Sequence, residues 1–180
     1  MGLFLLVLII LLWFILVYNR IVARRNAVDN AWAQIEVQLK RRHDLIPNLV
    51  EVVKGYLVHE QQTLENVIKA RTQAIQATTI KDKETAENIL TSALRSLFAV
   101  VEAYPDLKAN QNMLKLQEEI ISTENRIAFA RQYYNDEVTR YNITIQQFPF
   151  CIVAKIFGAS QRELFKIEDS SHKETPQVKL

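Results

Sequence analysis

The chain opens with an unbroken run of apolar residues. From Leu3 to Val17 every residue is Leu, Val, Ile, Phe or Trp, and the first charged side chain is Arg20. As a helix with a rise of about 1.5 Å per residue, the segment from Met1 to Tyr18 is roughly 27 Å long, and a snorkelling Arg20 supplies most of the remaining depth of a hydrocarbon core about 30 Å thick. The pattern therefore predicts a transmembrane anchor over residues 1–20.

A cleaved signal peptide is the alternative interpretation of this run. Such a peptide requires a positively charged start, a shorter apolar core and a cleavage site with small residues. The only charge before the run is the terminal amine, and Tyr18, Asn19 and Arg20 follow it. We therefore expect the helix to be retained as a single membrane span.

The charges that flank the span predict its orientation. Arg20, Arg24 and Arg25 follow the apolar run, whereas no basic side chain precedes it. Cytoplasmic flanks carry an excess of Lys and Arg, so the rest of the chain is expected in the cytoplasm, at the cell membrane. Because a single span has no second helix to confirm its direction, a periplasmic or extracellular location stays open as the alternative.

Beyond the span, apolar residues recur at helical spacing. Ile21, Val28 and Ile35 stand seven residues apart and form one face of a helix. No helix breaker separates this face from the apolar run, so we expect one continuous rod that ends near Asp44. Pro47 disfavours helical geometry at the residue before it and suits the first position of the next helix.

Three further helices are expected, over residues 47–77, 84–104 and 109–148, with a polar connection at 78–83. The core face of the first comprises Leu49, Val53, Tyr56, Leu57, Leu64, Val67, Ile68 and Ile75. The core face of the second comprises Ala86, Ile89, Leu90, Ala93, Leu94, Leu97, Phe98, Val101 and Tyr104. The third helix carries a heptad row of Met113, Ile120, Ile127, Tyr134, Tyr141 and Phe148.

The seven-residue spacing favours coiled-coil-like packing, and short connections make successive helices antiparallel. The predicted fold class is all-α: an N-terminal transmembrane helix that continues into an antiparallel up-down four-helix bundle over residues 21–148. Two segments follow the bundle. Residues 149–167 are apolar at first, and residues 168–180 form a polar tail that is expected to be disordered.

The apolar segment that begins at Phe148 admits two interpretations. The fourth helix returns toward the membrane, so its end should lie close to the bilayer, and the run to Phe157 contains aromatic residues and one lysine, Lys155. It is too short to span a membrane, but it could lie in the interface as a second lipid contact. The alternative is that it folds back and caps the bundle core.

Composition and charge exclude several classes of partner. The net charge is +2, and no aromatic interleaving or binding motif accompanies the run Lys40, Arg41 and Arg42, which is interpreted as a solvated helix end and not as a nucleic-acid site. The lone cysteine, Cys151, cannot form an internal disulfide, which fits a reducing compartment.

Two long segments and one short motif resemble the LemA family. They are RNAVDNAWAQIEVQLKRRHDLIPNLVEVVKGYLVHE at 25–60, YPDLKANQNMLKLQEEIISTENRIAFARQYYNDEVTRYN at 104–142, and QQFP at 146–149. The resemblance implies a bacterial membrane protein with an N-terminal span and a helical bundle. It implies no reaction, cofactor or catalytic residue. The chain departs from the family after Phe157, where members often continue with an aromatic and proline-rich segment.

The residues themselves predict no metal and no catalysis. None of the histidines, His43, His59 and His172, has a glutamate three residues before it, so the paired motif of di-iron bundles is absent. Zinc would need further Cys or His ligands. Cys151 lies in an apolar run without a neighbouring histidine, and no glycine-rich phosphate loop is present. We predict no enzyme activity, no cofactor, no metal and no catalytic residue.

Four charged residues interrupt the apolar stripes and form the candidate site. Glu60 on the second helix and Glu124 on the fourth are expected at similar heights, and Arg71 on the second and Arg131 on the fourth share another layer lower down. They predict a polar core network with two possible roles, a switch or ligand site on one hand and selection of the helix register on the other. Register selection is the better attested role of such charges.

Two functions are compatible with these features. The first is a scaffold or interaction module anchored in the bacterial membrane. The second is a regulatory or ligand-sensing subunit that transmits a signal through its span. The expected partners are membrane lipid and either a second copy of the chain or an unknown protein. A scaffold needs an exposed stripe on the bundle, whereas a sensor needs a polar cavity and a register that can shift.

Overall fold

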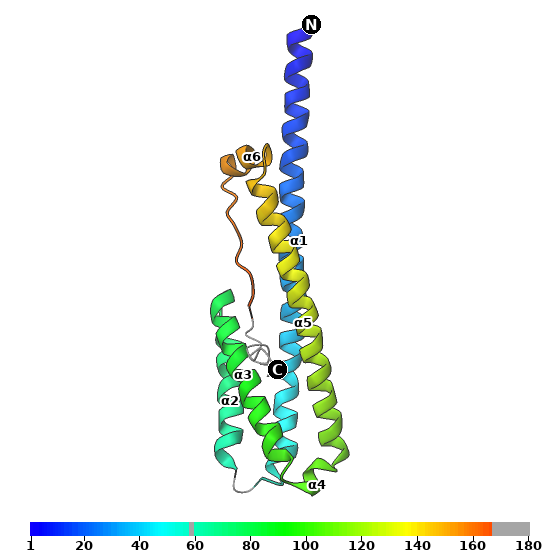
Figure 1. Ribbon diagram of the computed structural model, residues 1–180, viewed down its shortest axis with the longest axis vertical. Coiled ribbons are helices and arrows are strands. Elements are labelled where there is room, and N and C mark those ends of the chain that lie inside the picture. The colour runs from blue at the N-terminus through cyan, green and yellow to red at the C-terminus, as the bar shows by residue number, and fades with distance from the viewer. Residues whose placement is uncertain (58–59, 167–180) are drawn as a thin grey trace, which may run out of the picture. The chain divides into compact units, whose positions relative to one another are not determined.

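A computed structural model describes residues 1–57 and 60–166, and every regular element in these ranges is a helix (Figure 1). The helices are α1 (Gly2–Lys54), α2 (Gln61–Gln76), α3 (Ile80–Val101), α4 (Pro105–Lys108), α5 (Gln111–Gln146) and α6 (Phe150–Ile156). The all-α class is confirmed. The predicted polar tail at 168–180 lies outside the described residues, and the predicted domain limits stay predictions.

The chain divides into two compact units. Unit 1 contains residues 1–44 and 118–164, and unit 2 contains residues 45–117 and 165–180. The division falls inside α1 and inside α5. Each unit is described by itself below.

α1 is a single helix of 53 residues that continues through Pro47. The predicted end near Asp44, with a new helix at Pro47, is therefore wrong. A proline inside a helix removes one backbone hydrogen bond and crowds the preceding turn. The apolar periodicity is not interrupted there, however, because Ile46, Leu49 and Val53 are all fully buried at spacings of three and four residues. Burial of this stripe offsets the cost of the proline, and α1 ends only at Lys54, before Gly55.

The first part of α1 makes almost no contact with the rest of the described chain. It contains an 18-residue window of mean hydropathy 2.7, of which 6% is buried, and it is long and apolar enough to cross a membrane. Burial begins at Val17 and continues at Ile21 and Val28. An apolar helix with this exposure fits a membrane-associated protein, since the core helix of a soluble domain would be covered by its neighbours.

The core of unit 1 is the seam between α1 and α5, which run antiparallel. Arg24 of α1 lies beside Glu137 of α5, and Arg41 lies beside Glu119. The predicted heptad row on α5 is buried as far as Tyr141, but Phe148 is 80% exposed and lies beyond the end of α5. Placing Phe148 in that row was wrong, because the helical spacing ends at Gln146.

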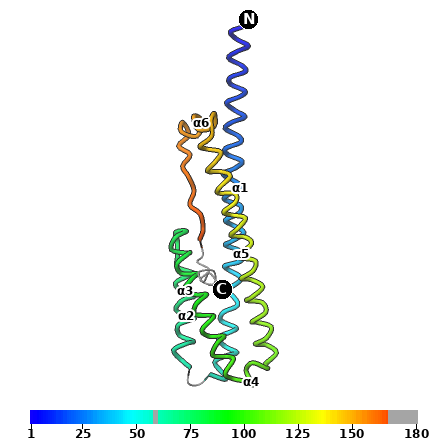
Figure 2. Tube along the Cα trace, viewed as in Figure 1, coloured from blue at the N-terminus to red at the C-terminus, as the bar shows by residue number. Residues whose placement is uncertain are grey.

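A return segment, residues 157–164, follows α6 and lies along α5 (Figure 2). Gly158 has a φ of 64°, and the N–H of Ala159 donates to the carbonyl of Ala154 at 2.9 Å, which is a Schellman end to α6. The side chain of Asn142 then bonds both the N–H and the carbonyl of Arg162, each at 2.9 Å. The Tyr134 hydroxyl donates to the Glu163 carbonyl at 2.9 Å. These bonds fix the segment after Phe157 against α5.

Unit 2 is built on α2 and α3, which pack against each other. α3 begins at Ile80 and not at residue 84, because the Thr79 hydroxyl oxygen accepts a hydrogen bond from the N–H of Asp82 at 3.0 Å and caps the helix. The predicted connection at 78–83 is thus mostly helix. After α4, the side chain of Asn110 accepts from the N–H of Asn112 at 2.9 Å and so caps the start of α5.

The buried face of α2 differs from the predicted one. Leu64, Val67, Ala70 and Ala74 are buried, whereas Ile68 and Ile75 are about half exposed. Small alanines allow two helices to approach closely, so they occupy the line of contact and displace the larger isoleucines to its edge. Tyr56 and Ile89, also predicted to be in the core, are 41% and 46% exposed.

Candidate functional site

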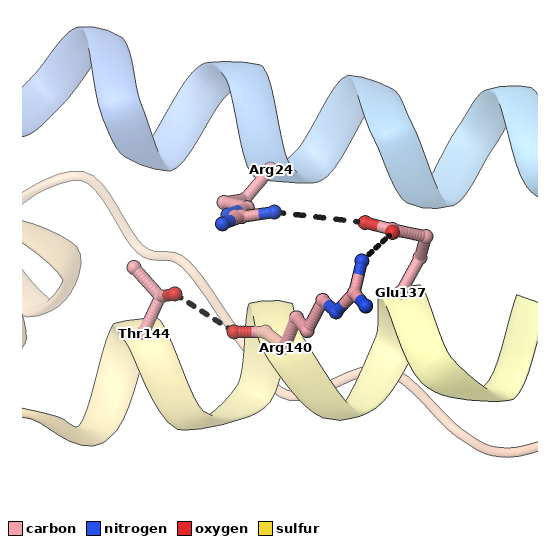
Figure 3. Close-up of polar contacts among 4 residues, drawn as sticks. All are labelled: Arg24, Glu137, Arg140 and Thr144. Carbon is pink, nitrogen blue, oxygen red and sulfur yellow. Dashed lines mark hydrogen bonds and ion pairs between the residues drawn. The ribbon is translucent and has the colours of Figure 1, made fainter.

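The most charged part of the described core lies in the α1–α5 seam of unit 1. Glu137 is 4% exposed. One of its carboxylate oxygens accepts a hydrogen bond from Arg140 at 2.7 Å, and the other lies 3.8 Å from the guanidinium of Arg24 (Figure 3). Two cations thus compensate one buried carboxylate. Both arginines are partly exposed, which lets them keep water contacts while they bind it.

Sequence reasoning did not find Glu137, although a signal for it exists. Glu137 is three residues after the buried Tyr134, and its own heptad row reads Thr123, Ala130, Glu137 and Thr144. This row of small and polar residues runs beside the apolar row, so it borders the partner helix. A row of this kind lets the backbones approach and leaves room for an arginine from α1.

A second buried ion pair joins the helices further along the seam. Arg42 is 2% exposed, and its guanidinium lies 3.6 Å from the carboxylate of Glu124. Burial lowers the pKa of Arg42 to about 10, against the opposing effect of the Glu124 charge. Arg42 therefore remains a cation at neutral pH, and its charge is held in a place poor in water.

Residues 40–42 are not a helix end, because α1 continues to Lys54, and of the predicted solvated side chains Lys40 and Arg41 are exposed whereas Arg42 is buried. The reason is its position, because Arg42 is the next member of the row Ile21, Val28 and Ile35. Its neighbour His43 is also buried, at 8% exposure. A charged residue in an apolar heptad row is expected to be buried. This expectation was missed because Arg42 also belongs to a run of three basic residues.

Aromatic side chains separate the two ion pairs. The rings of Trp32 and Tyr134 lie with their centroids 5.2 Å apart. Burial raises the pKa of the Tyr134 phenol, whose hydroxyl is held by the Glu163 carbonyl. The phenol therefore stays a neutral hydrogen-bond donor that ties the return segment to the seam.

The four residues of the predicted polar network are divided between the units. Glu60 and Arg71 lie in unit 2, and Glu124 and Arg131 lie in unit 1. All four are partly buried. The observed partner of Glu124 is Arg42, which the predicted network did not include. A network of all four residues stays a prediction.

A shallow groove lies on the outer side of unit 1, beside the seam. Its volume is about 460 Å³, and it is lined by Gln34, Val37, Gln38, Arg126, Phe129, Ala130 and Tyr133. Phe129 is 72% exposed and Val37 is 63% exposed. The side-chain carbonyl oxygen of Gln38 is buried at the groove and accepts no hydrogen bond. The groove thus offers exposed apolar surface to a partner, whereas the Gln38 oxygen lies beneath that surface.

Ligands for a metal are not gathered anywhere in residues 1–57 and 60–166, since no group of three or more His, Cys, Asp and Glu side chains occurs there. Cys151 is half-buried on α6 and forms no disulfide. The predicted absence of enzyme activity and of cofactors stays a prediction.

Three relatives of similar sequence align with most of this chain. The chain is 25% identical to magnetosome protein MamQ 2 of Paramagnetospirillum magneticum, over 83% of this chain and 64% of that protein. It is 27% identical to protein LemA of Metamycoplasma hominis, over 84% of this chain and 74% of that protein. Magnetosome protein MamQ of Magnetospirillum gryphiswaldense is 22% identical, over 82% and 64%. The chain thus spans about 64% of the length of the MamQ relatives.

The family model described as LemA family matches residues 31–180. That range covers most of the chain, including the Arg42–Glu124 ion pair and the groove, whereas Arg24, which pairs with Glu137, lies before it. The resemblance noted from the sequence is confirmed, and the chain belongs to the LemA family.

Proposed function

We propose that this chain is a single-pass, membrane-anchored interaction protein of the bacterial cell membrane, without catalytic activity, whose groove on unit 1 binds a partner helix. The start of α1 serves as the anchor, and the four long helical segments form the up-down bundle expected from the sequence. The observation that carries the proposal is the groove formed by Val37, Phe129 and Tyr133.

The exposure of Phe129 supports a binding role. A phenylalanine that is 72% exposed contributes little to folding, and exposed aromatic residues beside a groove are common centres of protein interfaces. Phe129 and Tyr133 are four residues apart on α5, so both face the same side of the helix. A partner helix laid along the groove would cover both rings.

Charge defines the chemistry of that partner. Arg126 lies at the groove, is exposed and has no ion-pair partner among the described residues. The partner is therefore an amphipathic helix with an apolar face for Val37 and Phe129 and an acidic side chain for Arg126.

A second copy of the chain fits this groove less well. Two copies anchored in one membrane would run parallel, and a two-fold axis that passed through the groove at Arg126 would place this arginine against its own copy. Like charges in contact disfavour such a pair. A different protein with an acidic helix is the better occupant.

The alternative function is a sensing subunit that transmits a signal through the span. It requires α1 to shift against α5, which would separate Arg24 from Glu137 and Arg42 from Glu124. Paired charges in a seam oppose such a shift because each intermediate position leaves buried charges without partners. The seam therefore favours a fixed scaffold.

Photo-crosslinking in the native membrane tests the proposal. Benzoylphenylalanine at Tyr133 of the full-length chain should give one discrete adduct, with a partner peptide that is an amphipathic helix bearing an acidic residue. Arg126→Glu should lower the adduct yield about tenfold by reversing the charge that faces the partner. Lys115→Glu, the same charge change at another exposed position of α5, is the matched control and should leave the yield unchanged.

Three outcomes contradict the proposal. One is no adduct at all, one is an adduct that is two copies of this chain, and one is an adduct that persists in Arg126→Glu. The side of the membrane is tested separately: a reporter fused after Leu180 should be active in the cytoplasm, because the arginines that follow the span favour that side. Activity outside the cytoplasm reverses this part of the proposal.

A further inference from the structure

α6 and its two flanks present an apolar face that is largely exposed in the described chain. Phe148, Ile152, Ile156 and Phe157 are between 51% and 80% exposed. The opposite side of α6 carries Val153 and Ala154, which are 0% and 3% exposed. Both sides of α6 are therefore apolar: the inner side is buried, and the outer side is exposed.

This outer face adjoins the apolar start of α1. The ring of Phe157 lies 4.5 Å from that of Tyr18 and 6.0 Å from that of Phe14, measured between centroids. In Figure 1, α6 stands beside α1 at the level where the apolar run of α1 meets the paired part of unit 1. The exposed apolar surface of α1 is thus continuous with that of α6.

The level of this contact matches a membrane boundary. Tyr18 is followed by the exposed Arg20, and Trp13 stands one turn before Val17. Tyr and Trp side chains gather at the interface of a bilayer, and arginines next to a span extend into the headgroups. If α1 crosses the membrane, α6 lies at the boundary between acyl chains and headgroups.

The charges around α6 specify the kind of lipid. Lys155 is exposed on α6, and Arg20 and Arg25 are exposed on α1. No acidic residue occurs between Glu137 and Glu163, or between Met1 and Asp29. The apolar face is therefore bordered by cations alone, which complements an anionic bilayer surface.

We infer that α6 is a second membrane contact, which inserts Phe148, Ile152, Ile156 and Phe157 into the interface of an anionic bilayer while Lys155 reaches its headgroups. Burial of Val153 and Ala154 fixes α6 to unit 1, so the contact also sets the tilt of unit 1 against the lipid. A cap on the bundle core accounts for the buried Val153 and Ala154 but not for an outer side that is just as apolar, which a helix facing water would not need. The inference rests on the membrane anchor of the proposed function and is independent of the groove.

The test uses the full-length chain with Cys151→Ser, reconstituted in vesicles of phosphatidylcholine and phosphatidylglycerol. Single cysteines that carry an environment-sensitive dye are placed at Ile152 in α6, at Leu8 in the span and at Gln132 on exposed α5. Nitroxide lipids should quench the dyes at Ile152 and Leu8 roughly threefold and leave the dye at Gln132 unquenched, because only a dye in lipid meets the nitroxide. Adding Lys155→Glu should weaken the quenching at Ile152.

The three positions separate two kinds of failure. Quenching at Leu8 without quenching at Ile152 overturns the inference and leaves the anchor intact. No quenching at Leu8 overturns the anchor, and with it the membrane role of α6. Equal quenching at Ile152 in vesicles of phosphatidylcholine alone contradicts the preference for anionic lipid.

Discussion

The two helix pairs of this protein differ in how many charges they bury. In unit 1, α1 and α5 bury Arg42 and Glu137 in their seam and pair them with Glu124, Arg24 and Arg140. In unit 2, α2 and α3 meet mainly along small and apolar side chains, among them Ala70 and Ala74, although α3 also buries Glu87, which is 1% exposed. Small residues bring helices close but fit several alignments, whereas a buried charge fits only where its partner stands. A long antiparallel pair gains more from buried charges because it has more wrong alignments available.

The largest expected effect is the loss of a partner in the charged seam. Glu124→Gln removes the carboxylate that lies 3.6 Å from the buried Arg42 guanidinium and should lower the free energy of unfolding by about 2–3 kcal/mol, below the usual cost of a broken buried pair because Glu124 is partly exposed. Chemical denaturation of the full chain in mild detergent measures it. Glu118→Gln, at an exposed site on the same helix, is the control.

Replacing both members of that pair sharpens the comparison. Burial already disfavours the Arg42 cation at every pH below about 10, so its charge opposes folding under ordinary conditions and Arg42→Leu with Glu124→Leu should restore most of the lost stability. The double variant should instead lose its unique alignment, seen as a mixture of oligomers on sizing columns. A monodisperse double variant would show that the pair does not select the register.

A steric change in the small-residue contact should have a smaller effect. Ala70 is 2% exposed between α2 and α3, so Ala70→Leu should cost about 2 kcal/mol by overpacking. Ala99→Leu adds the same bulk at an exposed position of α3 and should change stability by less than about 0.5 kcal/mol. Equal effects of the two variants would mean that the alanine line is not the contact.

The cap of α3 should contribute less again. Thr79→Ala removes the hydroxyl that accepts from Asp82 and should lower the free energy of unfolding by about 1 kcal/mol. Thr78→Ala, one residue earlier and also exposed, is the matched control. Thermal melting of both variants at the same protein concentration distinguishes them, and a Thr78→Ala effect as large as that of Thr79→Ala contradicts the assignment of the cap.

The smallest effect on stability is expected at the groove. Phe129→Ser removes an aromatic ring that is 72% exposed, so the free energy of unfolding should change by less than about 0.5 kcal/mol. Crosslinking at Tyr133 should nevertheless be lost. A large loss of stability would place Phe129 among the core residues and remove the basis for a binding role.

The sequence was sufficient for the features that local pattern controls. The helical class, the apolar start of α1 and the buried heptad row of α5 as far as Tyr141 all follow from spacing alone. The break expected at Pro47 was wrong because burial at Ile46 and Leu49 outweighs the local preference of proline. A local signal that was overlooked, Thr79 followed by Asp82, would have placed the start of α3 correctly.

The candidate site was harder to predict from the sequence, because it depends on which helices pack against each other. Glu124 was identified as a charge on an apolar stripe, but its partner Arg42 was concealed in a basic run. Glu137 lies outside the apolar row, so its burial follows only from the position of α1 beside it. Heptad rows reveal which side chains face inward, and they do not reveal the helix on the other side.

The return segment after α6 has a mechanical consequence. The Asn142 side chain forms two hydrogen bonds with the backbone of Arg162, and the Tyr134 hydroxyl donates a third to the Glu163 carbonyl. Tension applied to the chain beyond Lys166 would act first on the buried Phe165 and on the hydrogen bond from the Lys166 N–H to Glu84. Once these give way, it would act on the three bonds to α5, which would carry it in shear along the axis of that helix. These three hydrogen bonds therefore protect α6 from the force. Its contacts to Phe14 and Tyr18 carry no load until the three bonds break.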